Sequence, residues 1–399
     1  MHSKSHNLSK KKRLAIVATH PIQYSTPLYA ELSRRPELEV VVFFATDFGV
    51  TSQTDPEFGL AFAWDISLLT GFEYKILRQY GEDIKTGVAP TSVATNVASQ
   101  LRTGQFDAVL INGYFAKIDR EAIVAALIHR IPILFRPDGN DERESKSVIR
   151  NALRYTALTL LYTLISRYLS VGKISTTHYL NHFGRRSKVV LVPYSVDTKY
   201  FIKAREALLP KVDLRQSMGI SNHEPVILYC GKLIEKKNCE MLPKILRSLL
   251  SKSFAVTMVI VGAGPLMNSL KLEFEAITNS KVLFSGFQNQ SQIAKYYAIA
   301  DLLILPSQFG ETWGLVVNEA LALGLPAVVS DRVGCRHDLI VPGETGAVFE
   351  SNNVENAVQS IIQLFANKDA FAEMSKFCKE LSSKYSLEKS ADGIVTALS

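Results

Sequence analysis

The chain has 399 residues, and its 45 Lys and Arg against 38 Asp and Glu give a formal net charge of +7. Its composition, 47% hydrophobic and 21% charged, is that of a globular protein and excludes a disordered, collagen-like or coiled-coil chain. One hydrophobic core seldom spans 399 residues, so we expect two domains. The four cysteines include no Cys-x-x-Cys pair, which argues against a disulfide scaffold and a zinc ribbon.

Five of the seven surplus positive charges lie at the amino end, where residues 1–13 carry five Lys and Arg and no acid. We predict that residues 1–12 form a disordered, solvated basic tail. By itself this charge suits nucleic acid, an anionic membrane or a phosphate-bearing substrate. No apolar run reaches the roughly 18 residues that would suggest a membrane span.

A second basic feature is a helical pattern near residue 150. Its basic residues recur at steps of three and four, and they are Arg143, Lys146, Arg150 and Arg154. Another face of the same helix would carry Ile149, Leu153 and Leu161. We favour a core helix with a solvated basic edge. The alternative is a helix that rests on an anionic membrane leaflet.

Short apolar runs alternate with helical patterns along the chain. The expected strands are 14–18, 40–45, 108–111, 133–135, 168–171, 189–192, 226–230, 257–261, 282–284, 302–305 and 327–329. The helical patterns include 27–34, 238–250, 265–276, 291–300 and 315–323. Most of the strands are continuously apolar, which indicates burial on both faces of a parallel sheet. We therefore predict an α/β protein with doubly wound sheets.

The domain boundary is expected between residues 194 and 224, where the composition becomes mixed and charged. We place an N-terminal Rossmann-like domain at 13–200 and a C-terminal one at 201–385. The last segment, 386–399, is expected to be a helix. Whether this helix packs on the C-terminal domain or crosses back to the N-terminal domain is left open by the sequence.

Ligands of open α/β sheets bind at the carboxyl ends of the strands, so the loops there are the candidates for a site. After 226–230 come Gly231, Lys232 and Lys237, and two ammonium groups suit a diphosphate. A solvated lysine-rich loop is the plain alternative. After 257–261 come Gly264 and Pro265, where glycine lets a ligand approach the backbone and proline suits a first helical turn.

The loops after 282–284 and 302–305 complete this edge. Near Phe287, backbone groups suit a base edge, although a plain turn fits as well. After 302–305, Glu311 precedes a helix whose first amides, at Gly314, Leu315 and Val316, would bind an anion. Glu319 lies eight positions after Glu311, and the two carboxylates suit hydroxyls such as those of a sugar and a ribose.

Together these residues resemble the retaining glycosyltransferases of family 4, which have the GT-B fold. The resemblance covers residues 189–350. Its elements are Pro306-Ser307…Glu311-Thr312-Trp313-Gly314…Glu319-Ala320, Gly231-Lys232…Lys237, Val261-Gly262-Ala263-Gly264-Pro265 and Val196-Asp197…Phe201. It implies two Rossmann-like domains that face a central cleft.

The resemblance also implies roles for these residues. Lys232 and Lys237 would bind the donor diphosphate, and Glu311 would hold the donor sugar near its reacting carbon. The remaining donor-binding positions would be Gly231, Gly264, Pro265, Phe287, Trp313, Gly314, Leu315, Val316 and, at the ribose, Glu319. No catalytic metal or other cofactor is implied, and the sequence has no Asp-x-Asp motif.

The first half departs from the family's pattern. His20 stands in a His-Pro-Ile-Gln-Tyr run, similar to a subset of bacterial members, where many members have two glycines. A role near the acceptor or transferred sugar and a structural imidazole remain alternatives for His20. Asp138 and Asn140 follow the strand at 133–135, where they suit either acceptor hydroxyls or an Asx turn.

We predict a hexosyltransferase-type glycosyltransferase (EC 2.4) that moves a sugar from a UDP- or GDP-sugar to a hydroxyl of a glycan or lipid-linked acceptor. Cell-surface polysaccharide biosynthesis is the expected setting. The expected location is the cytoplasm, with peripheral docking on the inner leaflet as a further expectation. The alternatives are a nucleotide-sugar 2-epimerase on a GT-B-like scaffold and a non-enzymatic basic binder of membrane or nucleic acid. We expect no nucleic-acid partner.

Overall fold

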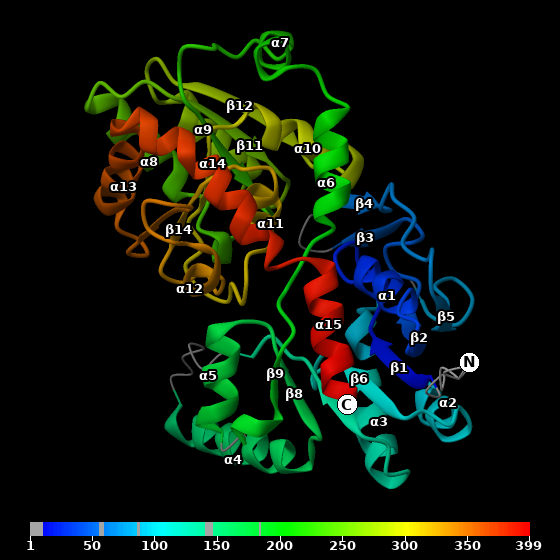
Figure 1. Ribbon diagram of the computed structural model, residues 1–399. Coiled ribbons are helices and arrows are strands. Elements are labelled where there is room, and N and C mark those ends of the chain that lie inside the picture. The colour runs from blue at the N-terminus through cyan, green and yellow to red at the C-terminus, as the bar shows by residue number, and fades with distance from the viewer. Residues whose placement is uncertain (1–10, 56–59, 86–87, 140–146, 183–184) are drawn as a thin grey trace, which may run out of the picture.

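The computed structural model describes residues 11–55, 60–85, 88–139, 147–182 and 185–399. They form two α/β domains, each built on a twisted parallel sheet covered by helices (Figure 1). The predicted α/β class with two parallel-sheet domains is therefore confirmed. The prediction of a disordered tail concerns mainly residues 1–10, which lie outside the described residues. β1 begins at Lys12, inside the expected tail, and the Arg13 guanidinium lies 2.8 Å from Glu39 on β2.

The N-terminal sheet has seven parallel strands in the order β5-β2-β1-β6-β7-β8-β9. The strands are β1 (Lys12–Ala18), β2 (Leu38–Thr46), β5 (Glu73–Arg78), β6 (Ala108–Ile111), β7 (Ile133–Phe135), β8 (Arg167–Ser170) and β9 (Val189–Leu191). The helices are α1 (Thr26–Ser33), α2 (Val97–Thr103), α3 (Lys117–Ile128), α4 (Val148–Leu164) and α5 (Lys173–Asn181). Apolar clusters cover both faces of the sheet, which explains why its central strands are continuously apolar.

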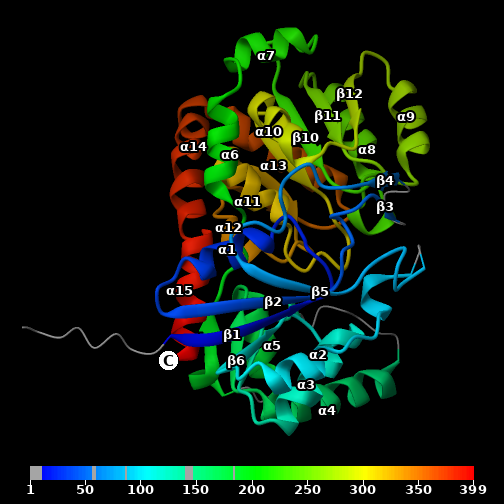
Figure 2. The ribbon, with the colours of Figure 1, turned by 90° about the vertical axis from the view of Figure 1, so that its right-hand side faces the viewer.

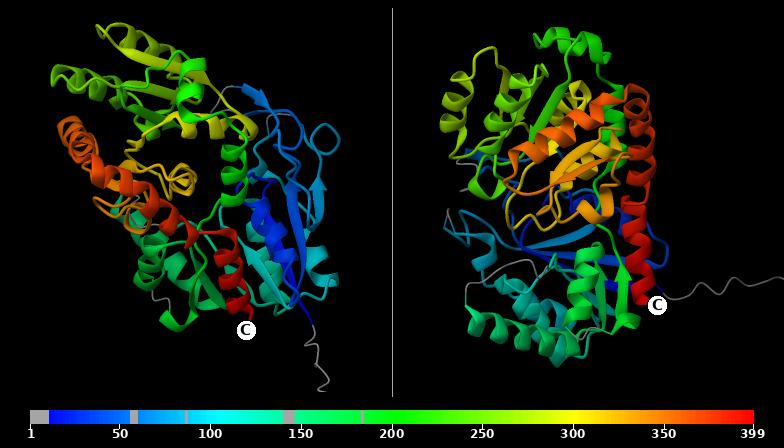
Figure 3. Two further views of the ribbon diagram at one scale, coloured as in Figure 1. Left: turned by 45° about the horizontal axis from the view of Figure 1, so that its top comes forward. Right: turned by 90° about the vertical axis from the view of Figure 1, so that its left-hand side faces the viewer.

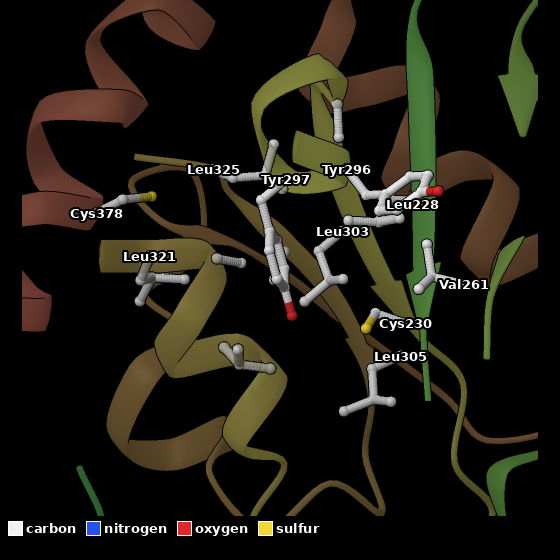
Figure 4. Close-up of a cluster of buried hydrophobic side chains, with 14 of the residues drawn as sticks. Leu228, Cys230, Val261, Tyr296, Tyr297, Leu303, Leu305, Leu321, Leu325 and Cys378 are labelled. Atoms are coloured by element: carbon white, nitrogen blue, oxygen red, sulfur yellow. The ribbon is translucent and has the colours of Figure 1, made fainter. Parts of the chain in front are cut away.

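The C-terminal sheet has six parallel strands in the order β12-β11-β10-β13-β14-β15. The strands are β10 (Val226–Cys230), β11 (Thr257–Val261), β12 (Lys281–Gly286), β13 (Leu302–Leu305), β14 (Ala327–Ser330) and β15 (Gly346–Phe349). The helices are α6 (Thr198–Glu206), α7 (Lys211–Ser217), α8 (Met241–Ser251), α9 (Met267–Glu275), α10 (Gln290–Ile299), α11 (Leu315–Ala322), α12 (Arg336–Leu339), α13 (Val354–Ala366) and α14 (Lys368–Ser383). Figure 4 shows Cys230, Leu303 and Leu305 of the central strands packed against Tyr297 of α10 and Leu321 of α11.

The two domains are connected a second time by the end of the chain. α14 and α15 (Leu387–Leu398) run along one edge of the molecule from the C-terminal to the N-terminal domain (Figures 2 and 3). α15 packs on α1 and β9, and Ser390 Oγ donates to the Pro193 carbonyl at 2.6 Å. The last helix therefore belongs spatially to the N-terminal domain.

The structure corrects part of the favoured interpretation of the basic helix. α4 packs on the core through Leu158, Leu161 and Tyr162. Ile149 and Leu153, however, are 75% and 67% exposed, so these two residues of the expected core face are in solvent. Arg143 and Lys146 lie outside the described residues. An antiparallel hairpin, β3 (Gln53–Asp55) and β4 (Leu60–Phe62), was not expected from the sequence.

Candidate active site

The candidate site lies where the carboxyl ends of the two sheets face each other. The loops after β10, β11 and β13 contribute from the C-terminal domain, and those after β1 and β7 from the N-terminal domain. The Glu311 loop is hydrogen-bonded to the N-terminal domain, since Thr312 Oγ1 donates to Asp138 Oδ2 at 2.6 Å. The structure thus brings Asp138, a predicted acceptor-side residue, next to the Glu311 loop.

An ion pair between Lys237 and Glu311 stands at the centre of the donor half. The Lys237 ammonium donates a hydrogen bond to Glu311 Oε2, and Ser307 Oγ donates to the same oxygen at 3.0 Å. Glu311 is only 9% exposed, and this burial alone would raise the pKa of its carboxyl. The charge and hydrogen bond of Lys237, together with the Ser307 hydrogen bond and the charge of Lys236, outweigh the burial and lower that pKa overall, so Glu311 is ionised at neutral pH.

Local backbone geometry positions Lys237. The lysine ends a short 3-10 helix, Glu235–Lys237, and Asn238 then adopts a left-handed conformation with φ of 52°. The Asn238 amide donates to Asn352 Oδ1 at 3.0 Å, which anchors the turn. Gln308 of the β13 loop donates its backbone N–H to the Lys236 carbonyl at 3.0 Å. The lysine loop and the glutamate loop are therefore fastened to each other.

Close packing between the loops after β10 and β11 explains why two positions there are glycine. A Cβ on Gly262 would lie 1.8 Å from the Gly231 carbonyl oxygen, and one on Gly264 would lie 2.4 Å from that of Leu233. Pro265 follows in an exposed position just before α9. Lys232 is half-buried, and its carbonyl accepts a hydrogen bond from the Tyr229 hydroxyl at 2.8 Å. Close backbone packing is thus sufficient to explain both glycines.

The indole of Trp313 packs between the domains. It is 4% exposed, and its Nε1 donates to Asn318 Oδ1 at 2.7 Å. A Cβ on Gly172 of the N-terminal domain would lie 2.5 Å from the Trp313 ring. Gly314 is the N-cap residue of α11, so the amides of the helix's first turn, at Leu315 and Val316, have no acceptor within the helix. The first turn of α11 therefore suits an anion.

Glu319 faces a different part of the cleft from Glu311. Burial raises the pKa of its carboxyl to about 7, although the Tyr297 hydroxyl, which donates to Glu319 Oε2 at 2.5 Å, lowers it in part. Glu319 lines a cavity of about 350 Å³ between the domains. The other residues that line this cavity are Gln23, Tyr24, Pro27, Ile66, Ser67, Val196, Asp197, Tyr200, Phe201 and Gln290.

The carboxyl of Glu319 should make the stability of the ligand-free protein pH-dependent. Its pKa of about 7 exceeds the usual 4.5, so the unfolded state releases this proton first and stability falls as the pH rises from 4.5 through 7. Glu319→Gln removes this loss. Between pH 5 and pH 8, the free energy of unfolding of the variant should therefore fall by about 2 kcal/mol less than that of the wild type. Urea unfolding at the two pH values measures the difference. Glu344→Gln, an exposed control, should follow the wild type. Parallel pH profiles for Glu319→Gln and the wild type would contradict the assignment.

The remaining predicted residues have varied surroundings. His20 is half-buried, with Nδ1 2.9 Å from Thr19 Oγ1 and its ring edge-on to Phe48 at 5.2 Å. Phe287 packs against Phe62 of the N-terminal domain, with ring centroids 4.8 Å apart. Asn140 lies outside the described residues.

Two residues that shape the site were not predicted from the sequence. Arg136 is 7% exposed, donates to the Val192 and Pro193 carbonyls at 3.3 and 3.2 Å, and stacks over the Tyr194 ring. The position of Arg136 directly after a buried strand is the one feature of the sequence that could have identified it as a site residue. Tyr297, the partner of Glu319, gave none, because its contact with a residue 22 positions away depends on tertiary packing.

In the part of the chain that the structure describes, no group of three or more His, Cys, Asp or Glu is arranged to hold a metal ion. Across the same residues, no helix is long and apolar enough to cross a membrane.

Comparison with known proteins supports the reading of the C-terminal domain. Residues 211–381, from α7 to α14, match the family described as "Glycosyl transferases group 1". An uncharacterised glycosyltransferase of Methanocaldococcus jannaschii is 35% identical over 125 residues, which cover 31% of this chain and 32% of that protein. A GDP-mannose-dependent alpha-(1-6)-phosphatidylinositol monomannoside mannosyltransferase of Mycolicibacterium smegmatis is 26% identical over 235 residues, 57% of this chain and 59% of its own.

The chain therefore spans between about a third and three-fifths of the length of these curated relatives. Among solved structures, HepE of Anabaena in complex with UDP superposes with a TM-score of 0.72 at 16% identity. The superposition covers 97% of this chain and 99% of HepE. At that identity the likeness establishes the two-domain GT-B fold.

Proposed function

We propose that this protein is a retaining glycosyltransferase of family 4 that transfers a sugar from a nucleotide sugar to an acceptor hydroxyl. The observation that carries the proposal is the Lys237–Glu311–Ser307 cluster beside the first turn of α11, opposite Asp138 of the other domain. The match of residues 211–381 to the group 1 glycosyl transferases supports it.

The positive groups of the site are suited to stabilise a nucleoside diphosphate as it leaves the sugar. As the bond from the sugar to the diphosphate breaks, negative charge develops on the leaving oxygen. The ammonium groups of Lys232 and Lys237 and the first amides of α11 are of the right sign to stabilise that charge. In this proposal Lys237 turns from Glu311 toward the diphosphate when the donor binds.

The released carboxylate of Glu311 then holds the donor sugar by accepting hydrogen bonds from its hydroxyls. We assign the acceptor to the N-terminal side, near Asp138 and His20, and propose front-face attack with the leaving phosphate as the base. Closure of the two domains excludes water that would otherwise hydrolyse the donor.

The donor in this proposal is a UDP- or GDP-sugar, and the acceptor is a hydroxyl of a glycan or a lipid-linked glycan. The UDP complex of HepE and the GDP-mannose dependence of the mycobacterial relative support these two donor classes.

A panel of UDP- and GDP-sugars tests the proposal by thermal stabilisation, because a ligand that binds the native state raises the unfolding temperature. At least one nucleotide sugar should stabilise the protein, and its diphosphate product should do so too. Stabilisation by none of them would contradict the proposal. Conversion of the donor sugar without any acceptor would favour the 2-epimerase alternative.

We further propose that the protein docks on an anionic membrane through the outer face of α4. Ile149, Leu153, Leu160 and Leu164 are 49–75% exposed, and their spacing places them on one stripe of the helix. The helix contains no acidic residue and carries Arg150 and Arg154. It lies at the end of the N-terminal domain farthest from the C-terminal domain (Figures 1 and 2). An apolar stripe with only positive charge beside it suits acyl chains below anionic headgroups.

Vesicle sedimentation tests this docking surface. Ile149→Gln/Leu153→Gln should reduce binding to vesicles of phosphatidylcholine and phosphatidylglycerol by more than about tenfold, because two apolar side chains no longer insert. Leu272→Gln is the matched control, since Leu272 on α9 is 68% exposed on the other domain. Equal binding of both variants, or no binding by the wild type, would contradict the proposal. Self-association that disappears in the double variant would instead assign the stripe to a second copy of the chain.

A further inference from the structure

A short segment of the N-terminal domain reaches across to the C-terminal domain. We call residues 62–67, which begin at the end of β4, the arm. β3 and β4 lie at the edge of the N-terminal domain that borders the C-terminal domain (Figures 1 and 2). The arm meets the loop between β12 and α10 and the first turn of α10.

The arm is fastened by hydrogen bonds around Asp65. The Asp65 backbone N–H donates to Asn289 Oδ1 at 3.2 Å, and the Asn289 amide donates to the Ala63 carbonyl at 2.8 Å. The Ser291 backbone N–H donates to Asp65 Oδ1 at 3.2 Å, and the Ser291 hydroxyl donates to Asp65 Oδ2. Asp65 therefore caps a helix of the other domain, and its negative charge suits the positive end of that helix.

Aromatic side chains continue the same contact. Phe62 and Trp64 of the arm pack against each other with ring centroids 5.1 Å apart. Both also contact Phe287, at centroid distances of 4.8 and 6.4 Å. Edge-on and tilted packing of this kind contributes attraction beyond the burial of apolar area.

The other end of the arm forms a wall of the interdomain cavity. Ile66 and Ser67 line that cavity together with Glu319 and with Gln290 of the capped helix. The same segment thus contacts Phe287 on one side and closes the space in front of Glu319 on the other. The family resemblance implies that these two residues border the nucleoside and its ribose, and we keep those roles for the proposed function.

We propose that the arm is a clasp that closes the domains over the nucleoside half of the donor and limits how fast the nucleoside diphosphate leaves. This inference rests on the proposed function, because it takes a nucleotide as the ligand. Asp65 is a positioning residue that acts through α10 and Phe287. Asp65 and Ser291 are both exposed, so water can replace their hydrogen bonds and the clasp can open without unfolding either domain.

The dissociation rate of nucleotide tests the clasp. Labelled UDP and GDP are displaced by an excess of the unlabelled nucleotide from the wild type, from Asp65→Asn and from Ser291→Ala. Each variant should release the better-binding nucleotide about tenfold faster, because Asp65→Asn removes the charge of the accepting group and Ser291→Ala removes one hydrogen bond to that charge. The double variant should match Asp65→Asn, since the Ser291 hydroxyl acts on the arm through Asp65. Asp213→Asn, an exposed aspartate in the first turn of α7, should release it at the wild-type rate.

The outcomes separate this inference from the proposed function. Unchanged release rates in both single variants would overturn the clasp while leaving the proposed function intact, and so would a lower unfolding temperature with unchanged release. If folded wild-type protein binds neither UDP nor GDP, the proposed function fails and the clasp fails with it.

Discussion

Replacing Lys237 by methionine is expected to lower sugar transfer by about two to three orders of magnitude, the loss seen when one charge-stabilising donor is removed from an active site. The variant keeps the apolar stem but lacks the ammonium that faces Glu311. Binding of UDP or GDP should weaken in parallel, because the diphosphate loses a positive partner. Steady-state kinetics and nucleotide titration measure the two effects.

The stability of the Lys237→Met variant should also depend on pH differently from that of the wild type. In the wild type, Lys237 lowers the pKa of Glu311, so the pair stabilises the fold above about pH 4.5 and loses this contribution as the pH falls. Without Lys237, burial is the largest influence left on the pKa of Glu311 and acts to raise it, so the variant should lose the stability that the wild type gains as the pH rises through 4.5. The expected cost near neutral pH is about 3 kcal/mol, as for one partner left alone in a buried pair. Lys252→Met, which breaks an exposed pair with Glu355, is the control and should be nearly neutral. Wild-type transfer by Lys237→Met would refute the role assigned to this lysine.

Replacing Glu311 by glutamine is the second large effect. Transfer should again fall by about two to three orders of magnitude, because the carboxylate that would hold the sugar is lost. Unlike the lysine variant, Glu311→Gln should bind UDP or GDP at least as tightly as the wild type. The reason is that Lys237 no longer has a carboxylate partner competing with the diphosphate.

The two variants should differ in nucleotide affinity, and this difference separates the roles of Lys237 and Glu311. The lysine variant should lose both nucleotide affinity and turnover, whereas the glutamate variant should lose turnover alone. Glu355→Gln, the surface counterpart, should change neither. Loss of nucleotide affinity in a folded Glu311→Gln variant, or transfer within a few-fold of the wild type, would count against the assigned role.

The central strands were predictable from the sequence, because burial on both faces leaves a continuous apolar run. The runs 226–230, 257–261 and 302–305 agree with β10, β11 and β13 at both ends. The edge strand β5 gave no such signal. It is exposed along much of its length, and Glu73, Lys75 and Arg78 leave it without an uninterrupted apolar run.

The error at α4 has a related cause. Hydrophobic periodicity identifies an apolar face but does not say whether protein covers it, and Ile149 and Leu153 lie on a face that is in solvent. In the site, strand order placed Lys237 and Glu311 on the same edge of a sheet. Their direct contact, across 74 positions, could not be read from spacing. The same holds for the bond of Asp138 to Thr312, which depends on how the two domains meet.

The most direct test of glycosyl transfer is the product formed from a nucleotide sugar that stabilises the protein. Incubated with that donor and a glycan or lipid-linked acceptor, the wild type should release the nucleoside diphosphate. The new glycosidic bond should keep the anomeric configuration of the donor, as read from the anomeric proton by NMR, and Lys237→Met should form almost none of it. An inverted linkage would contradict the proposed retaining mechanism, and conversion of the donor without transfer would contradict the function itself.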